Sequence, residues 1–278
     1  MPAPDAAEHP VLETHGLTIS FGGHVAVDGV SCAFRPGTLT AIVGPNGAGK
    51  TTYFNLISGQ LRPSAGRVSL FGEDITLLPA PQRTRRGMGR AFQLTNLFPQ
   101  LTVLENVRLA VQSHARMGLN LFSVWSGHVE LIERAEHYLE RTALAERRDT
   151  PASALPHGDQ RKLEVAILLA LEPDIFMFDE PTAGMSVDEV PVILELIHGI
   201  KQQQDKTVLL VEHKMDVVRS LADRIIVLHQ GELVADGNPA EVIASPIVQQ
   251  AYLGVAVEEE KGSGSNSGPH WGQRDGSR

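Results

Sequence analysis

The most informative stretch of the sequence is a glycine-rich loop, residues 44–52, which reads GPNGAGKTT. Its glycines and the following Lys50 and Thr51 have the spacing of a phosphate-binding loop. Glycines let backbone N–H groups approach a triphosphate closely, while Lys50 would reach the β and γ oxygens and the Thr51 hydroxyl would bind Mg²⁺. Chance produces this pattern in roughly one chain of this length in a hundred. The predicted ATP-binding residues of the loop are Gly44, Pro45, Asn46, Gly47, Ala48, Gly49, Lys50, Thr51 and Thr52.

A second chemical feature is an acidic pair, Asp179 and Glu180, which ends the apolar run IFMFDE. Open α/β sheets gather ligand-binding groups at the carboxyl ends of their strands. Asp179 can therefore hold Mg²⁺, directly or through water, and Glu180 can orient or deprotonate an attacking water. An acidic pair alone is more often a solvated strand end, but the phosphate loop upstream favours the chemical interpretation.

The residues ahead of the glycine-rich loop, 12–43, read as β-strands. Hydrophobic side chains alternate in LTISF, at Leu17, Ile19 and Phe21, and again in the run that holds Cys32. The short run LTAIVG is a buried strand that feeds directly into the loop. We interpret Cys32, the one cysteine of the chain, as a core thiol, and no intramolecular disulfide is possible.

Helices and strands then follow in a recognisable order. Tyr53, Leu56 and Ile57 would share one face of a helix after the loop. Residues 103–148 are poor in glycine and have helical spacing, which predicts a helical subdomain inserted into the core. Strand-like runs return as DIFMFDE and TVLLVEH, and RIIVLHQGELVADG reads as a hairpin that turns at QG.

Composition fits one large α/β domain without a membrane span. The 278 residues are 42% hydrophobic and 21% charged, which allows a sizeable core. The N-terminus lacks the basic start and apolar centre of a signal peptide, and no apolar run approaches the ~20 residues of a spanning helix. A net charge of −9 argues against a nucleic-acid partner. The Gly- and Ser-rich end, 258–278, is expected to be disordered.

The order of the motifs resembles that of an ATP-binding-cassette ATPase over residues 12–254. The phosphate loop is followed by Gln93 in GRAFQ, a signature region, the acidic pair, PTAGMS and His213. The resemblance implies an α/β fold with a P-loop (RecA-like) core, an N-terminal antiparallel β subdomain and an inserted helical subdomain at about 96–168. It also implies ATP as substrate and Mg²⁺ as its companion ion.

The resemblance also implies roles for residues outside the loop. Phe21 would stack on adenine, and Gln93 would contact Mg²⁺ and link the site to a membrane partner. His213 would hold the γ-phosphate, while residues 183–186 would cross a dimer interface. Without the shared order, these side chains would pass for a core aromatic, a surface amide and a strand-end histidine.

The signature region departs from the family pattern Leu-Ser-Gly-Gly-Gln. In the family, this helix start faces the γ-phosphate that the other subunit holds. Pro156 removes a hydroxyl and an N–H there, and Asp159 adds a negative charge unless it is turned away. Either these changes are harmless, or each lost hydrogen bond to a charged group costs about 1.5–3 kcal/mol and weakens closure. The signature residues are Leu155, Pro156, His157, Gly158 and Asp159. The helix that Gly158 opens would bury one face, made of Leu163, Ala166, Ile167 and Ala170.

Finer features resemble the ATPase subunits of branched-chain amino acid-type importers. The stretches that carry this resemblance are FGGHVAVDGV, GPNGAGKTTYFNLISG, GRAFQLTNLFPQLTVLENV, RMGLNLFSVWS and ADGNPAEVIASPIVQQAYLG. In such importers two related ATPases usually pair under two integral membrane permease subunits, and a periplasmic binding protein delivers the solute. The resemblance thus implies a peripheral protein at the cytoplasmic face of the inner membrane, in a homodimer or heterodimer.

The expected function is ATP hydrolysis that powers import of branched-chain amino acids or related small solutes. A regulatory subunit that binds ATP but hydrolyses it poorly is the main alternative. An exporter ATPase fits the C-terminal stretch less well. A cassette working on DNA or ribosomes would usually carry a second cassette or a long coiled coil, and this sequence shows neither.

Overall fold

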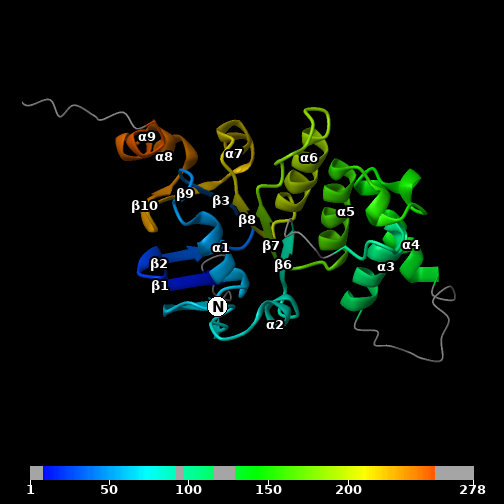
Figure 1. The fold of residues 1–278 in the computed structure, drawn as a ribbon, viewed down its shortest axis with the longest axis horizontal. Helices are drawn as coiled ribbons and strands as arrows, with labels where there is room; N and C mark the ends of the chain where they lie inside the picture. The colour runs from blue at the N-terminus through cyan, green and yellow to red at the C-terminus, as the bar shows by residue number, and fades with distance from the viewer. Residues whose placement is uncertain (1–8, 92–96, 116–128, 254–278) are drawn as a thin grey trace, which may run out of the picture.

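The computed structural model describes residues 9–91, 97–115 and 129–253, which form two β-sheets and the helices around them (Figure 1). The strands are β1 (Leu12–Phe21), β2 (His24–Phe34), β3 (Leu39–Val43), β4 (Ala65–Leu70), β5 (Glu73–Asp74), β6 (Met88–Ala91), β7 (Ile175–Asp179), β8 (Thr207–Val211), β9 (Arg224–His229) and β10 (Glu232–Gly237). The helices are α1 (Lys50–Ser58), α2 (Ala80–Thr84), α3 (Val103–His114), α4 (Val129–Arg141), α5 (His157–Ala170), α6 (Val190–Lys201), α7 (Met215–Leu221), α8 (Pro239–Ala244) and α9 (Pro246–Leu253). Short 3₁₀ turns, η2 (Ala145–Arg147) and η3 (Ala152–Ala154), precede α5.

The N-terminal sheet has the strand order β2-β1-β4-β5, and its strands pair antiparallel. The alternation in the sequence holds for most of β1 and β2, because Leu17, Ile19 and Cys32 are buried. At the end of β1 the expectation from alternation is wrong, since Phe21 is 49% exposed where the hairpin extends beyond its neighbours. Strands β4 and β5 were not anticipated from the sequence, although they complete the predicted antiparallel subdomain.

The central sheet has the strand order β10-β9-β3-β8-β7-β6 and is parallel except for β10. All residues of β3 and β8 are buried, as expected for strands covered on both faces. The hairpin of β9 and β10 turns at Gln230 and Gly231, which both have positive φ, so the predicted turn is confirmed. This strand order places β8 between β3 and β7, which decides which loops meet at the carboxyl edge.

Helix α1 is enclosed between the two sheets. Tyr53, Leu56 and Ile57 are fully buried, as predicted, in a core cluster shared with β1, β2 and one face of the central sheet. The opposite face of the central sheet packs on α5, α6 and α7. A third cluster joins β3 and β9 to α8 and α9, which Figure 1 shows at the end of the molecule opposite α4.

Helices α3, α4 and α5 lie between β6 and β7 in the chain and gather at one end of the molecule, as the predicted helical insertion requires (Figure 1). In α4 the buried residues have the expected 3.6-residue spacing. In α5 the expectation of a single buried face is wrong. Ile167 of the predicted face is only partly buried, whereas Val165, Leu168 and Leu169 are buried, because α5 packs on the central sheet and on α3 and α4 together.

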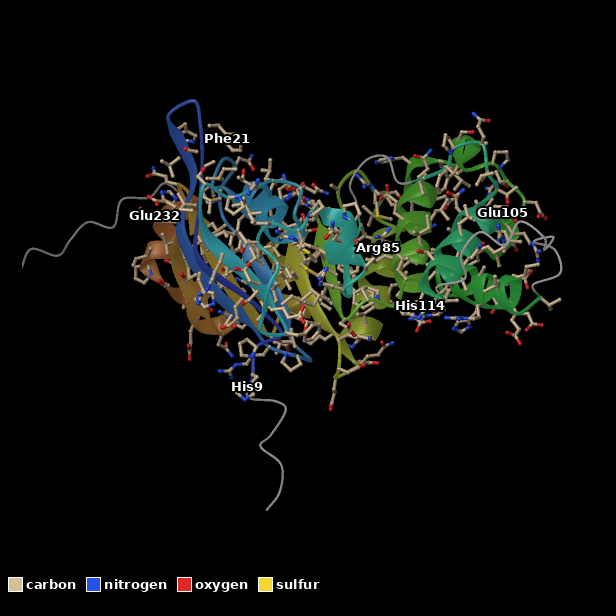
Figure 2. All side chains as sticks on the ribbon, turned by 90° about the horizontal axis from the view of Figure 1, so that it is seen from below. His9, Phe21, Arg85, Glu105, His114 and Glu232 are labelled. Atoms are coloured by element: carbon tan, nitrogen blue, oxygen red, sulfur yellow. The ribbon has the colours of Figure 1, made fainter. Side chains whose placement is uncertain are left out.

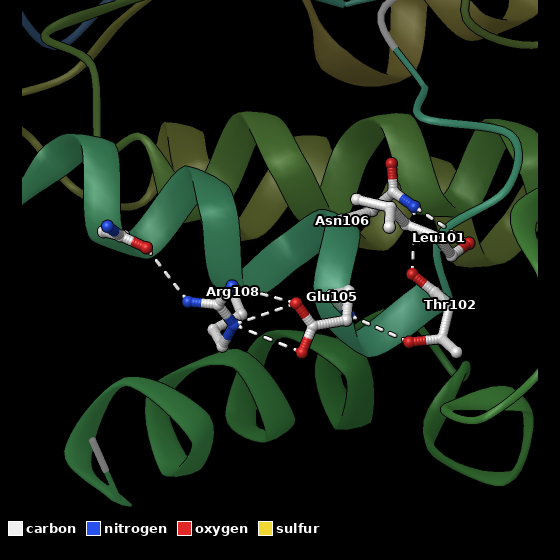
Figure 3. A network of polar contacts seen from close by, with 6 residues as sticks. Leu101, Thr102, Glu105, Asn106 and Arg108 are labelled. Carbon is white, nitrogen blue, oxygen red and sulfur yellow. Dashed lines mark hydrogen bonds and ion pairs between the residues drawn. The ribbon is translucent and has the colours of Figure 1, made fainter. Parts of the chain in front are cut away.

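Asn106 anchors the chain that enters the helical part. Its amide accepts from Phe98 N and donates to the carbonyls of Phe98, Leu101 and Thr102, while only 2% of the residue is exposed. Thr102 caps α3 by accepting from Glu105 N, and Glu105 binds Arg108 (Figure 3). These contacts fix residues 97–102 to α3.

Within the described ranges, none of the helices is both long and apolar enough to cross a membrane.

Candidate active site

The glycine-rich loop connects β3 to α1 and packs tightly against two other strands. A Cβ on Gly44 would overlap the Leu228 carbonyl, and a Cβ on Gly49 would overlap the Ala26 carbonyl. Gly47 has φ +81° with open space beside it. Only glycine meets these demands, so the loop holds a fixed curve around the start of α1.

The start of α1 is suited to an anion. Its N-cap is Gly49, which has no side chain to accept from the first backbone N–H groups, and the first turn holds no acidic residue. Such a helix start attracts phosphate through its N–H groups and dipole. The glycines that let the loop pack closely, together with a helix start that has no internal acceptor, thus fit a nucleotide phosphate.

Lys50 lies inside the loop. Its ammonium donates to the carbonyls of Gly44 at 2.8 Å and Pro45 at 3.0 Å. Burial lowers the pKa of Lys50, while the nearby carboxylates of Glu180 and Asp179 act in the opposite direction. The cation therefore sits between the phosphate loop and the acidic pair.

Asp179 is the last residue of β7 and Glu180 follows it, at the edge predicted from the sequence. Asp179 Oδ2 accepts from Arg90 Nη2 at 2.7 Å, and both side chains are largely buried. Arg90 also donates to Asn55 and Ser58 at the end of α1, and its guanidinium lies 4.7 Å from the Phe54 ring centroid. Asp179 is thus tied to the helix that carries the phosphate loop.

Glu180 has an unusual backbone. Its φ of 50° places a non-glycine residue in the left-handed region, which costs energy and is typical of functional positions. The Glu180 amide donates to Val211 O at 2.9 Å, which fixes it to β8. His213 follows β8, and its Nδ1 lies 3.8 Å from Glu180 Oε1. Because β8 lies between β3 and β7, the predicted residues Lys50, Glu180 and His213 come together.

Two further predicted residues are Gln93 and Phe21. Gln93 lies just after β6, outside the described residues. Phe21 lies at the exposed end of the β1–β2 hairpin (Figure 2), so it is not a core aromatic, and its ring is accessible to an adenine. Thr51 and Thr52 follow Lys50 in the first turn of α1.

The signature residues form the start of α5. Pro156 is the N-cap, with φ −56° and ψ 157°, and it is exposed together with His157, whereas Leu155 and Gly158 are buried. Asp159 is turned toward Lys162, which donates to it at 2.9 Å. The sequence left open whether Asp159 would project a bare charge toward a phosphate, and this ion pair neutralises it.

The donor set fits Mg²⁺ held in part by a nucleotide. Within the part of the chain that the structure describes, no group of three or more His, Cys, Asp or Glu could hold a metal ion. Magnesium usually keeps several waters and takes only one or two protein ligands beside substrate phosphates. Asp179 and the Thr51 hydroxyl are oxygen ligands of that kind, so the residues present suit such a shared site.

Several residues of the site escaped sequence reasoning. Arg90 lies in the quoted GRAFQ without having been assigned a role. Glu189 and Thr182 flank the predicted interface stretch, and Glu212 precedes His213 but is only 1% exposed. The position of Glu212 in the sequence VEH could have predicted its role, because an acid directly after a buried apolar strand needs hydrogen-bond partners.

The chain as a whole is similar in sequence to proteins of known family. A family model described as ABC transporter matches residues 27–183, and one described as branched-chain amino acid ATP-binding cassette transporter matches 232–258. The high-affinity branched-chain amino acid transport ATP-binding protein LivG of Salmonella typhimurium is 40% identical over 254 residues, which are 89% of this chain and 99% of LivG. The protein of the same description from Pseudomonas aeruginosa, BraF, is 39% identical over 252 residues, with the same coverage.

Solved structures agree with the fold. The ADP conformation of MJ1267, an ATP-binding cassette of an ABC transporter, matches with a TM-score of 0.75 at 29% identity, covering 88% of this chain and 99% of that one. A nucleotide-free ATP-binding cassette from an ABC transporter matches with a TM-score of 0.74 at 29% identity, covering 87% and 98%.

Proposed function

Because the chain belongs to the ABC transporter family of ATP-binding cassette ATPases, we propose that it powers an importer of branched-chain amino acids or related small solutes. The observation that carries this proposal is the convergence of Lys50, Glu180 and His213 at the carboxyl edge of the central sheet. The match of residues 232–258 to the branched-chain model, together with the relatives LivG and BraF, supports the solute class.

The proposed chemistry follows from charge and position. The backbone N–H groups at the start of α1 and the Lys50 ammonium bind the β and γ phosphates, and Phe21 stacks on the adenine. Glu180 accepts a proton from the attacking water, and His213 donates to the γ-phosphate. Thr51, Asp179 and Gln93 would hold Mg²⁺, which when bound would supply positive charge that offsets the charge of the phosphates.

The signature residues act in a dimer in this proposal. The start of α5 faces the γ-phosphate of the other ATPase subunit, with the Gly158 N–H as a donor. Pro156 suits a helix start because it fixes φ and needs no N–H partner there. The backbone shape of the site therefore survives without the serine hydroxyl.

The proposed partners are two integral membrane permease subunits and a second ATPase, which is either a related chain or another copy of this one. A periplasmic binding protein would deliver solute without touching this chain. The location would be the cytoplasmic face of the inner membrane. We further propose that residues 12–254 form the ATPase domain, that about 96–168 form its helical subdomain, and that the tail 258–278 lies outside the domain.

A regulatory subunit that hydrolyses ATP poorly is the second candidate. The observation that favours it is the exposed Pro156, which cannot supply the hydroxyl or the N–H that serine would offer to a partner's nucleotide. Turnover in the complex with the membrane subunits separates the candidates. A regulatory subunit would leave turnover unchanged when Glu180 is replaced.

The test is uptake by the purified transporter in vesicles, with ATP inside and labelled leucine or valine outside. We expect uptake that needs ATP and is lost with Lys50→Ala. Lys206→Ala is the control and should leave uptake intact, because Lys206 lies directly before β8, at the amino ends of the parallel strands. ATP turnover without uptake of any branched-chain amino acid would contradict the solute class. A wild-type complex without ATP turnover would contradict the function itself.

A further inference from the structure

Glu212 is a buried acid that the chemistry described above does not use. It lies between β8 and His213, and 1% of the residue is exposed. Its backbone N–H donates to Ile42 O, in the strand that leads into the phosphate loop. Burying a carboxylate is costly unless it is hydrogen-bonded, so its partners show what it holds in place.

Among the residues that the structure describes, the hydrogen-bond donors to this carboxylate come from the two loops that carry the catalytic groups. Oε2 accepts from His213 N at 2.9 Å and from Lys214 N at 3.1 Å, which fixes the backbone of the histidine loop. Oε1 accepts from the Thr182 hydroxyl at 2.7 Å. Thr182 is also 1% exposed, and its carbonyl accepts from Lys214 Nζ at 3.4 Å.

Thr182 connects two functional segments along the chain. It lies two residues after Glu180 and directly before the stretch 183–186, which the proposed function places at the dimer interface. A hydrogen bond between Thr182 and Glu212 therefore links that stretch to His213 through one buried side chain. A displacement of either loop must break this hydrogen bond or move the other loop with it.

Resting on the proposed function, we infer that Glu212 is a positioning residue for ATP hydrolysis, which ties the His213 loop to Thr182 and so to the interface stretch. Glu212 touches neither nucleotide nor water in this role. It sets where His213 lies relative to Glu180 and makes that placement depend on the interface stretch. ATP binding, which relies on the phosphate loop, does not require it.

The test compares Glu212→Ala, Glu212→Gln and Thr182→Val in the purified transporter. A misplacement of about 1 Å can cost on the order of 100-fold in rate, so Glu212→Ala should lower kcat by roughly 10- to 100-fold. The Kd for ATP should change by less than about twofold, because transition-state placement alone is lost. Glu212→Gln should recover most of kcat, since its carbonyl can accept both backbone N–H groups and its amide can donate to Thr182.

Thr182→Val should lower kcat less than Glu212→Ala does, because it removes only one contact of the carboxylate. The double variant Thr182→Val/Glu212→Ala should be no slower than Glu212→Ala alone, since both changes break one link. Thr142→Val is the matched control. Thr142 is fully buried, and its hydroxyl donates to the α4 carbonyls of Tyr138 and Leu139, away from both loops. A comparable loss of thermal stability should therefore leave kcat unchanged.

Three results would overturn the inference: wild-type kcat in folded Glu212→Ala and Thr182→Val, a Glu212→Gln as slow as Glu212→Ala, or a Kd for ATP that rises in parallel with the loss of kcat. Should Glu212→Ala fail to fold, Glu212→Gln and Thr182→Val still decide the matter. A wild-type complex without turnover would overturn the proposed function and this inference together. An active wild type with unaffected variants would overturn the inference alone.

Discussion

The carboxylate of Glu189 lies against Gly158 of the same chain, so that a Cβ on Gly158 would overlap its oxygens. Glu189 also accepts from Ser186 N at 3.1 Å and Ser186 Oγ at 2.9 Å. These hydrogen bonds hold the pKa of Glu189 below its usual range, so the carboxylate is ionised at neutral pH. In the proposed dimer a partner's γ-phosphate approaches the same helix start, and the two anions compete for it.

Glu189→Gln should therefore tighten ATP-driven dimerisation. A charge at a helix start changes binding by roughly two- to fivefold at moderate salt, and the gain should shrink as salt rises. The measurement is the dimer dissociation constant at saturating ATP, with Glu180→Gln in both chains to stop hydrolysis. Asp188→Asn, which removes an exposed charge one residue away, should have little effect. A weaker dimer with Glu189→Gln would contradict the competition.

Pro156→Ser should also tighten the dimer, for a different reason. Serine restores a hydroxyl and an N–H beside the partner's phosphate, and a hydrogen bond to a charged group is worth about 1.5–3 kcal/mol. Asp159→Asn should change the same constant by less than about twofold, because Lys162 already pairs with that carboxylate. An unchanged dissociation constant for Pro156→Ser would show that the backbone alone serves the phosphate.

Arg90→Met should destabilise the fold strongly. The Asp179 carboxylate is largely buried, and the substitution removes its cationic partner. Breaking such a buried pair typically lowers the free energy of unfolding by about 3–5 kcal/mol. Arg86→Met is the control, because its ion pair with Glu73 is exposed and should contribute little. The measurement is the free energy of unfolding by urea, and equal losses for the two variants would contradict the assigned role of Arg90.

The local parts of the site could be predicted from the sequence, and the long-range parts could not. The phosphate loop, its strand and its helix follow from residues next to one another. Arg90 and Asp179 are 89 positions apart, so their pairing depends on β6 lying beside β7. The contact of Glu189 with Gly158 likewise needs the tertiary fold. The alternation predicted that Phe21 would be buried, which is wrong because the β1–β2 hairpin extends past the elements that would cover it.

The stability should depend on pH through Glu172. Burial alone would raise its pKa, but hydrogen bonds from Tyr138 and Arg134, each at 2.7 Å, outweigh burial and hold the pKa of Glu172 below its usual range. A carboxyl with a lowered folded pKa stabilises above its unfolded pKa, and this contribution is lost as pH falls through the folded pKa.

Glu172→Gln should therefore be less stable than the wild type at pH 7, with a difference that narrows as pH drops below about 4. Glu172 is partly exposed, so the difference at pH 7 should stay below about 1 kcal/mol. Urea unfolding across this range measures it. A difference that widens toward low pH would have the wrong sign for this mechanism.

ATP turnover of the purified transporter with Glu180→Gln tests whether Glu180 activates water for ATP hydrolysis. The amide keeps the shape but cannot accept the proton, and loss of a general base typically costs 10²–10⁴-fold in rate, so we expect turnover to fall by on the order of 100-fold or more. The Kd for ATP should stay within about twofold, because the phosphate loop is untouched, and an ATP-bound dimer should accumulate. Near-normal turnover in Glu180→Gln would show that Glu180 is not the base for ATP hydrolysis.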